Sequence, residues 1–215
     1  MANTTWNPAD LINTTVSASN LLATANAGTF NGGVRSVDAQ AAGKYYFELA
    51  MTTLNQVDTV FGIANASAVL SSVITSSAVN ACYTRFNGSL YYNGTTTGIS
   101  LGTLSPTTSR VCIALDMTGK LLWMRYPVTG NWNGSGSANP ATGVGGLSIS
   151  AIAGVPIYAL FAFATAGSAG STEQCTANFG DSAFLGTVPS GFTAGFPAGG
   201  GGGAAAAQAR AVIMA

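Results

Sequence analysis

The chain has 215 residues, of which only seven are basic and seven acidic, so its formal net charge is zero. Folded domains usually carry a charge at about a quarter of their positions, so this surface must consist largely of neutral polar residues. Since the basic residues are few and dispersed, the counterion release that drives nucleic-acid binding has no source. DNA and RNA are therefore excluded as expected partners.

Length and cysteine usage predict one domain with a large core. A chain of this size buries most of the surface that it exposes when unfolded, without disulfide or metal cross-links. The three cysteines, Cys82, Cys112 and Cys175, form an odd set without metal-ligand spacing, and we expect them to be buried hydrophobic residues. The first residues lack the pattern of a secretory signal, and no uncharged stretch is apolar enough to span a membrane. We therefore expect synthesis in a cytoplasm and no membrane insertion.

Alternation of apolar and polar residues predicts short β-strands along the whole chain. In 44–51, the side chains of Tyr45, Phe47, Leu49 and Met51 would share one face, which is typical of a half-buried strand. Asn-Gly pairs at 31–32, 87–88, 93–94 and 133–134 predict tight turns between such strands. The predicted strands are 21–25, 33–37, 44–52, 59–64, 81–86, 89–92, 110–116, 120–126, 157–163 and 173–179.

Turn chemistry predicts two hairpins in this series. Strands 81–86 and 89–92 flank Asn87-Gly88, a two-residue loop in which both residues would need a positive φ. Strands 110–116 and 120–126 flank a three-residue loop, 117–119, in which Gly119 suits the left-handed position. No helix competes with these strands. The sequence therefore predicts an all-β fold, an antiparallel two-sheet sandwich of the jelly-roll or concanavalin-like type.

The chain changes character after Pro197. Five glycines at 199–203 predict a flexible linker, and the following tail contains Val212, Ile213 and Met214 with a single charge, Arg210. We expect a sandwich at 1–197, a linker at 198–203 and an apolar tail at 204–215. The tail is a candidate anchor that would add to a sheet edge or lie in an apolar groove of another subunit. Alternatively, it folds back on its own sandwich or continues into a longer protein.

Residues for catalysis are scarce. Histidine is absent, which removes the usual general base, the serine-protease triad and the commonest metal ligand. The seven carboxylates are scattered singly, without the pairing that a glycosidase needs, and no loop has the oxygen ligands of a calcium site. We therefore expect no enzyme activity, no metal and no cofactor.

Two loops carry candidate ligand-binding residues. Trp132 lies in a polar, glycine-rich loop, where its indole would stack on a sugar while Asn131 and Asn133 offer hydrogen bonds. Asn93 and Thr95 belong to a second loop that is free to vary on a rigid scaffold. The alternative is that the Trp132 indole folds back onto its own sheet, because an exposed tryptophan is costly without a partner.

Several short motifs occur in a fixed order between residues 6 and 192. They are Trp6-Asn7-Pro8-Ala9-Asp10, Val34-Arg35-Ser36, Gly43-Lys44-Tyr45-Tyr46-Phe47-Glu48, Phe61-Gly62-Ile63-Ala64, Tyr91-Tyr92-Asn93-Gly94, Gly119-Lys120-Leu121-Leu122-Trp123, Ala177-Asn178-Phe179-Gly180 and Pro189-Ser190-Gly191-Phe192. This order resembles the SPRY family of concanavalin-like sandwiches, in the form found in bacteriophage virion proteins. The resemblance implies recognition through loops at one end of the sandwich, with no catalytic residues.

Three functional hypotheses follow. The first is a non-enzymatic component on the exterior of a phage or phage-like particle, made in the host cytoplasm: a tail fibre, a receptor-binding tip, a head fibre or a capsid decoration. Its partners would be other virion proteins, further copies of itself and, as a further candidate, a host-surface glycan. The second hypothesis is a lectin-like module for glycan or peptide, and the third a carbohydrate-active enzyme.

Overall fold

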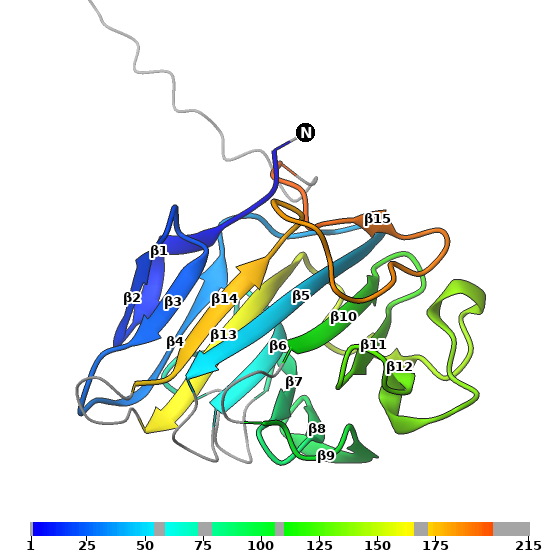
Figure 1. The fold of residues 1–215 in the computed structure, drawn as a ribbon, viewed down its shortest axis with the longest axis horizontal. Coiled ribbons are helices and arrows are strands. Elements are labelled where there is room, and N and C mark those ends of the chain that lie inside the picture. Colours follow the sequence, from blue (N-terminus) through cyan, green and yellow to red (C-terminus); the bar gives the residue numbers. More distant parts are fainter. Residues whose placement is uncertain (1, 54–58, 73–78, 106–109, 166–171, 200–215) are drawn as a thin grey trace, which may run out of the picture.

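The computed structural model of the protein has two β-sheets that lie face to face (Figure 1). It describes residues 2–53, 59–72, 79–105, 110–165 and 172–199. Neighbouring strands pair antiparallel in both sheets, with the exception of the short strand β15, which pairs parallel to β5. Within the described residues the helical elements are two short 3-10 turns, so the prediction of an all-β two-sheet sandwich is confirmed.

The two sheets contain all the described strands. In spatial order, the seven-stranded sheet consists of β1 (Trp6–Ile12), β4 (Phe30–Ser36), β13 (Ile157–Thr165), β6 (Thr59–Asn65), β7 (Ala81–Arg85), β8 (Ser89–Tyr92) and β9 (Thr95–Ser100). The eight-stranded sheet consists of β12 (Leu147–Ser148), β11 (Leu121–Arg125), β10 (Arg110–Asp116), β5 (Lys44–Thr53), β14 (Gln174–Asn178), β3 (Leu22–Ala25) and β2 (Thr14–Ser17), with β15 (Thr193–Ala194) beside β5.

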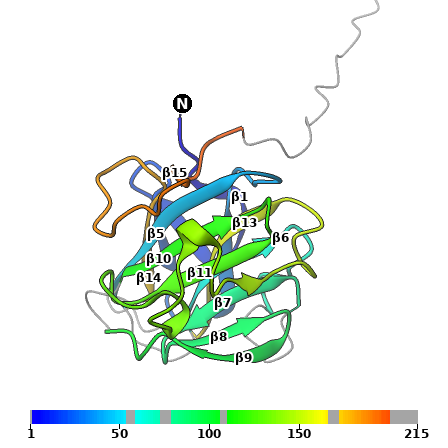
Figure 2. The same cartoon turned by 90° about the vertical axis from the view of Figure 1, so that its right-hand side faces the viewer.

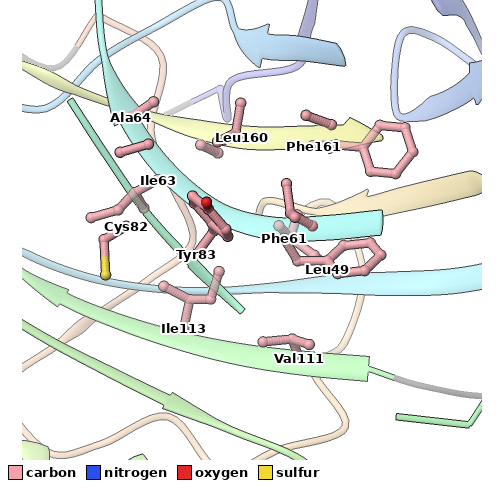
Figure 3. Close-up of a cluster of buried hydrophobic side chains, with 14 of the residues drawn as sticks. Leu49, Phe61, Ile63, Ala64, Cys82, Tyr83, Val111, Ile113, Leu160 and Phe161 are labelled. Atoms are coloured by element: carbon pink, nitrogen blue, oxygen red, sulfur yellow. The ribbon is translucent and has the colours of Figure 1, made fainter. Parts of the chain in front are cut away.

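The main core fills the space between the sheets, where aromatic and branched side chains of both inner faces meet (Figure 3). Phe61 on β6 pairs with Phe161 on β13, and both rings are fully buried. From the other sheet, Leu49 of β5 and Ile113 of β10 join the same cluster. The alternation that predicted strand 44–52 therefore identified the inner face of β5 correctly.

Five strands escaped the sequence-based prediction: β1, β2, β9, β12 and β15. β1 contains Pro8 and Asp10, which are compatible with a strand here because β1 lies at the edge of its sheet. β9 is built of threonines with Gly98 and lacks apolar alternation. β12 and β15 have only two residues each, too few for any periodicity to be visible.

Both predicted hairpins form, but their loops differ from the prediction. Thr84 pairs with Leu90, which leaves the three-residue loop 86–88 in which only Gly88 has a positive φ, of 81°. Asp116 pairs with Leu121, which leaves a four-residue loop in which the left-handed residue is Lys120, not Gly119. Gly119 instead donates its N–H to the Asp116 carboxylate over 2.7 Å, and a Cβ there would press against that carboxylate.

The two ends of the sandwich chain pair with each other. The N–H of Thr4 donates to Phe196 O over 2.9 Å, and the N–H of Ala198 donates to Ala2 O over 3.0 Å. Gly199 donates its N–H to the Asp38 carboxylate over 2.8 Å. The first two residues of the expected linker 198–203 are thus hydrogen-bonded to the sandwich. The candidate anchoring residues Arg210, Val212, Ile213 and Met214 lie outside the described residues.

Candidate functional site

A second apolar cluster lies on the outer face of the eight-stranded sheet. Its buried members are Tyr46, Cys112, Ala114, Trp123, Trp132 and Phe192. They are buried because two segments cross this face: residues 127–146, which Figure 2 shows in front of β10 and β11, and residues 180–192, which we call the strap. The outer face of β5, which its sequence pattern gave to solvent, is therefore an interior surface.

The strap is fixed by the carboxylate of Glu48, which projects from β5 and is fully buried. Glu48 Oε1 accepts the N–H of Gly186 over 2.8 Å and the hydroxyl of Tyr46 over 2.7 Å. Glu48 Oε2 accepts the N–H of Leu185 over 3.3 Å and pairs with the guanidinium of Arg110 at 2.9 Å. The Cys112 thiol also donates to Oε1, over 4.0 Å, so both oxygens of the buried carboxylate have several donors, which is the condition for burying a charge.

Two further side chains hold the strap on either side of this point. The Asn178 amide donates to Ser182 O and Ala183 O, each over 3.2 Å. The guanidinium of Arg125 donates to Thr187 O over 3.2 Å. The backbone on both sides of Leu185 is therefore anchored, while the Leu185 side chain remains 69% exposed.

The structure places Trp132 inside this cluster, and its side chain is only 9% exposed. Its ring lies edge-on to Tyr46 with the centroids 6.4 Å apart, and the Arg125 guanidinium stacks over it at 4.3 Å. Asn133 is buried as well, and its amide bonds Met124 N, Leu122 O and Gly145 O over 2.9–3.0 Å. Both side chains therefore hold the loop against the sheet. This arrangement corresponds to the alternative in which the Trp132 indole folds back onto its own sheet.

The other predicted contact residues lie apart from one another. Asn131 is exposed beside the Trp132 turn, and Thr95 is exposed at the start of β9. Asn93 is half-buried, and its side-chain oxygen accepts the N–H of Asn80 over 2.9 Å. The Trp132 turn touches β9 at its opposite end, where Gly134 lies directly against Ser100 O. At about 3.3 Å per residue, the length of β9 separates the two loops.

Two ionisable side chains of this cluster, Tyr46 and Cys112, have raised pKa values. Burial, together with Cys112 and Glu48, raises the pKa of Tyr46 above its ordinary value, so the hydroxyl stays protonated and donates to Glu48. Burial likewise raises the pKa of the Cys112 thiol. In the part of the chain that the structure describes, no three His, Cys, Asp or Glu side chains come together to hold a metal ion, and no helix is long and apolar enough to cross a membrane.

Sequence reasoning missed the residues that organise this site: Glu48, Arg125, Asn178 and Leu185. Glu48 alternates with core residues and reads as a solvent-facing position. Tyr46, two positions before Glu48, was the signal that could have revealed the covered face. A tyrosine on the polar face of a strand suggests that another segment packs over it.

Comparisons with known proteins concern the fold. No protein-family model matches the sequence, and no curated protein matches it. Among solved structures, the SPRY domain of human HERC1 superposes with a TM-score of 0.61 at 14% identity, over 83% of this chain and 99% of that chain. The PSpry domain of TRIM65 gives 0.56 at 12% identity, over 82% of this chain and 89% of that chain. Stonustoxin gives 0.51 at 16% identity, over 82% of this chain and 27% of that chain.

The chain therefore has a SPRY-type sandwich fold, as the order of its motifs predicted. On the eight-stranded side, the strap and the segment 127–146 form an outer layer that is packed and hydrogen-bonded to the sheet.

Proposed function

We propose that this chain is a non-enzymatic recognition and structural component on the exterior of a phage or phage-like particle, and that it contacts a protein partner through the strap. The observation that carries the recognition role is the anchored backbone around Leu185, which presents an exposed leucine from a fixed position. A preorganised loop loses little conformational entropy on binding. Most of the free energy gained by burying such a side chain therefore contributes to affinity. The partner would offer an apolar pocket for this side chain.

The particle assignment rests on composition and on the family resemblance. A neutral Ser, Thr, Asn and Gly surface without histidine suits a structural or recognition protein. Tail fibre, receptor-binding tip, head fibre and capsid decoration all agree with these features. The tail, with Val212, Ile213 and Met214, is the proposed anchor to other virion proteins, and homo-oligomers would form within the particle.

A lectin-like module is the second candidate, and the structure gives it less support than the sequence did. The Trp132 indole packs on Tyr46 and Arg125, so it is not available to stack on a sugar ring. Asn131 and Thr95 are the exposed polar side chains among the predicted contact residues.

The particle assignment is tested by electron microscopy of particles made with and without this gene product. Density that disappears with the gene supports the proposal. Particles whose composition and density do not change refute it.

The contact surface is tested with Leu185→Asp and a matched control, Val155→Asp, which introduces the same charge at another exposed aliphatic residue that is 50% exposed. We expect Leu185→Asp to lower particle or partner binding at least tenfold, which corresponds to the loss of one buried leucine. Both variants should keep the wild-type melting temperature. Equal binding by the two variants would place the contact surface elsewhere.

A further inference from the structure

A shallow groove lies at the end of the sandwich where residues 2–4 meet residues 196–199. Its volume is about 470 Å³, and it is lined by Asn3, Tyr45, Thr193, Ala194, Pro197, Ala198 and Gly199. The ring of Tyr45 packs edge-on against the buried Phe196, with the centroids 5.7 Å apart. No charged side chain is among the lining residues. The groove therefore suits a short, uncharged and mainly apolar segment.

Both walls of the groove are held by the sandwich. On one side, Thr193 and Ala194 form β15, which is paired to Tyr45 and Tyr46 of β5. On the other side, Pro197 O accepts the Gln40 amide over 2.8 Å. Ala198 and Gly199 are tied to Ala2 and Asp38. The groove is therefore formed before any ligand arrives.

The chain itself supplies a segment of the required chemistry. Residues 212–214 are three consecutive apolar side chains, and Arg210 is the only charged residue after Gly199 in the sequence. Gly199, the last described residue, itself lines the groove. Residue 212 follows 13 positions later, and a flexible chain of that length spans about 20 Å on average. Four further glycines, 200–203, let the chain reverse its direction.

We propose that the groove holds the C-terminal segment of the same chain, residues 212–214. A tethered segment of this length has an effective concentration on the order of millimolar, far above that of a second copy in dilute solution. Docking withholds these apolar side chains from other contacts while the chain is free. The docking itself does not depend on the proposed function; the use of the released tail as an anchor does.

The test is paramagnetic relaxation in the full chain with a nitroxide at Ala209→Cys. The three native cysteines are buried, so the label is attached while the chain is folded. We expect the amide signals of Tyr45, Thr193 and Ala194 to lose about half of their intensity or more, because docking of residues 212–214 holds the label beside the groove. The same label combined with Ala194→Arg, which fills the groove at an exposed position, should restore these signals. Ala183→Arg, at an exposed alanine of the strap, is the matched control and should not restore them.

A mixture of spin-labelled, isotopically unlabelled chain and ¹⁵N-labelled chain without nitroxide distinguishes the occupants. Broadening in the single species and none in the mixture supports docking within one chain. Broadening in the mixture of the same size, rising with concentration, assigns the groove to the tail of a second copy and overturns the proposal. Absence of broadening in both, or broadening that Ala194→Arg leaves unchanged, also overturns it. Particle binding through the strap is measured separately, so the two proposals fail independently.

Discussion

Replacing Glu48 by glutamine tests the idea that one buried carboxylate fixes the strap. The substitution keeps the size of the side chain and one acceptor oxygen, and it turns the other oxygen into an amide group that donates. Glu48 Oε1 accepts three hydrogen bonds, from Tyr46, Gly186 and the Cys112 thiol, and Oε2 accepts two, so the amide would face at least two donors in either orientation. The guanidinium of Arg110 would also lose its ion-pair partner.

The expected magnitude follows from these contacts. A hydrogen bond to a charged group contributes about 1.5–3 kcal/mol, so two lost bonds correspond to about 3–6 kcal/mol before any relaxation. The Arg110 side chain is 26% exposed and recovers part of its hydration, which places the net loss near the lower end. We expect a decrease of about 3 kcal/mol in the free energy of unfolding and a melting temperature lower by about 6–12 °C.

Thermal unfolding by circular dichroism measures the decrease, and hydrogen exchange at Leu185 and Gly186 measures its location. Both amides should exchange faster in Glu48→Gln, because their acceptor is weakened. Asp181→Asn is the control: it removes the same charge from an exposed residue of the strap, and surface changes of this kind stay within about 0.5 kcal/mol. A variant with wild-type stability and unchanged exchange at these two amides would refute the assigned role of Glu48.

Three further predictions concern Trp132, the cysteines and the C-terminal tail. Trp132→Ala should lower the free energy of unfolding by about 3–5 kcal/mol, the usual cost of emptying a buried tryptophan site, and chemical denaturation of this variant checks the value. Burial raises the pKa of the Cys82, Cys112 and Cys175 thiols above 9.0, so unfolding above that pH releases protons. Stability should be constant well below pH 9 and fall above it, by up to about 4 kcal/mol per pH unit for three thiols; denaturation between pH 7 and 10, with alanine at these positions as control, checks the slope. A chain ending at Gly199 should fold as a monomer with unchanged melting temperature, yet fail to enter the particle; normal occupancy would end the anchoring hypothesis, and loss of folding would place the tail in the domain.

Much of the fold was visible in the sequence because strands of a sandwich carry a period-2 signal. Strands β8 and β10 have the predicted bounds, and β5 differs by one residue. One error falls where two local preferences compete. In the β10–β11 loop, Gly119 has the freedom to be left-handed, but the Asp116 carboxylate captures its N–H, and Lys120 takes the positive φ instead.

The candidate site was less predictable, because its defining feature is a second layer on a sheet face. Sequence periodicity assigns one face of a strand to the core and gives the other to solvent. Whether a distant segment crosses that other face is a long-range property: the strap residue Gly186 lies 138 positions from Glu48. For the same reason, the sequence did not show that Trp132 is buried. A tryptophan exposed in a loop and a tryptophan that packs onto a sheet face have the same local sequence.

The chain has few charged residues, and several of them hold loops in place. Three ion pairs among the described residues each connect two segments of the chain. Arg110 and Glu48 hold the strap, and Lys44 and Asp116 join the ends of β5 and β10 at 2.9 Å. Arg35 is bonded to Asp10 and also donates to the carbonyl oxygens of Asn65, Ala66 and Ala68, which fixes the turn after β6. Because these charges are engaged internally, the partner in the proposed function would meet mainly apolar, hydroxyl and amide groups. The proposed recognition would then depend on shape and on single exposed side chains such as Leu185 more than on electrostatic attraction.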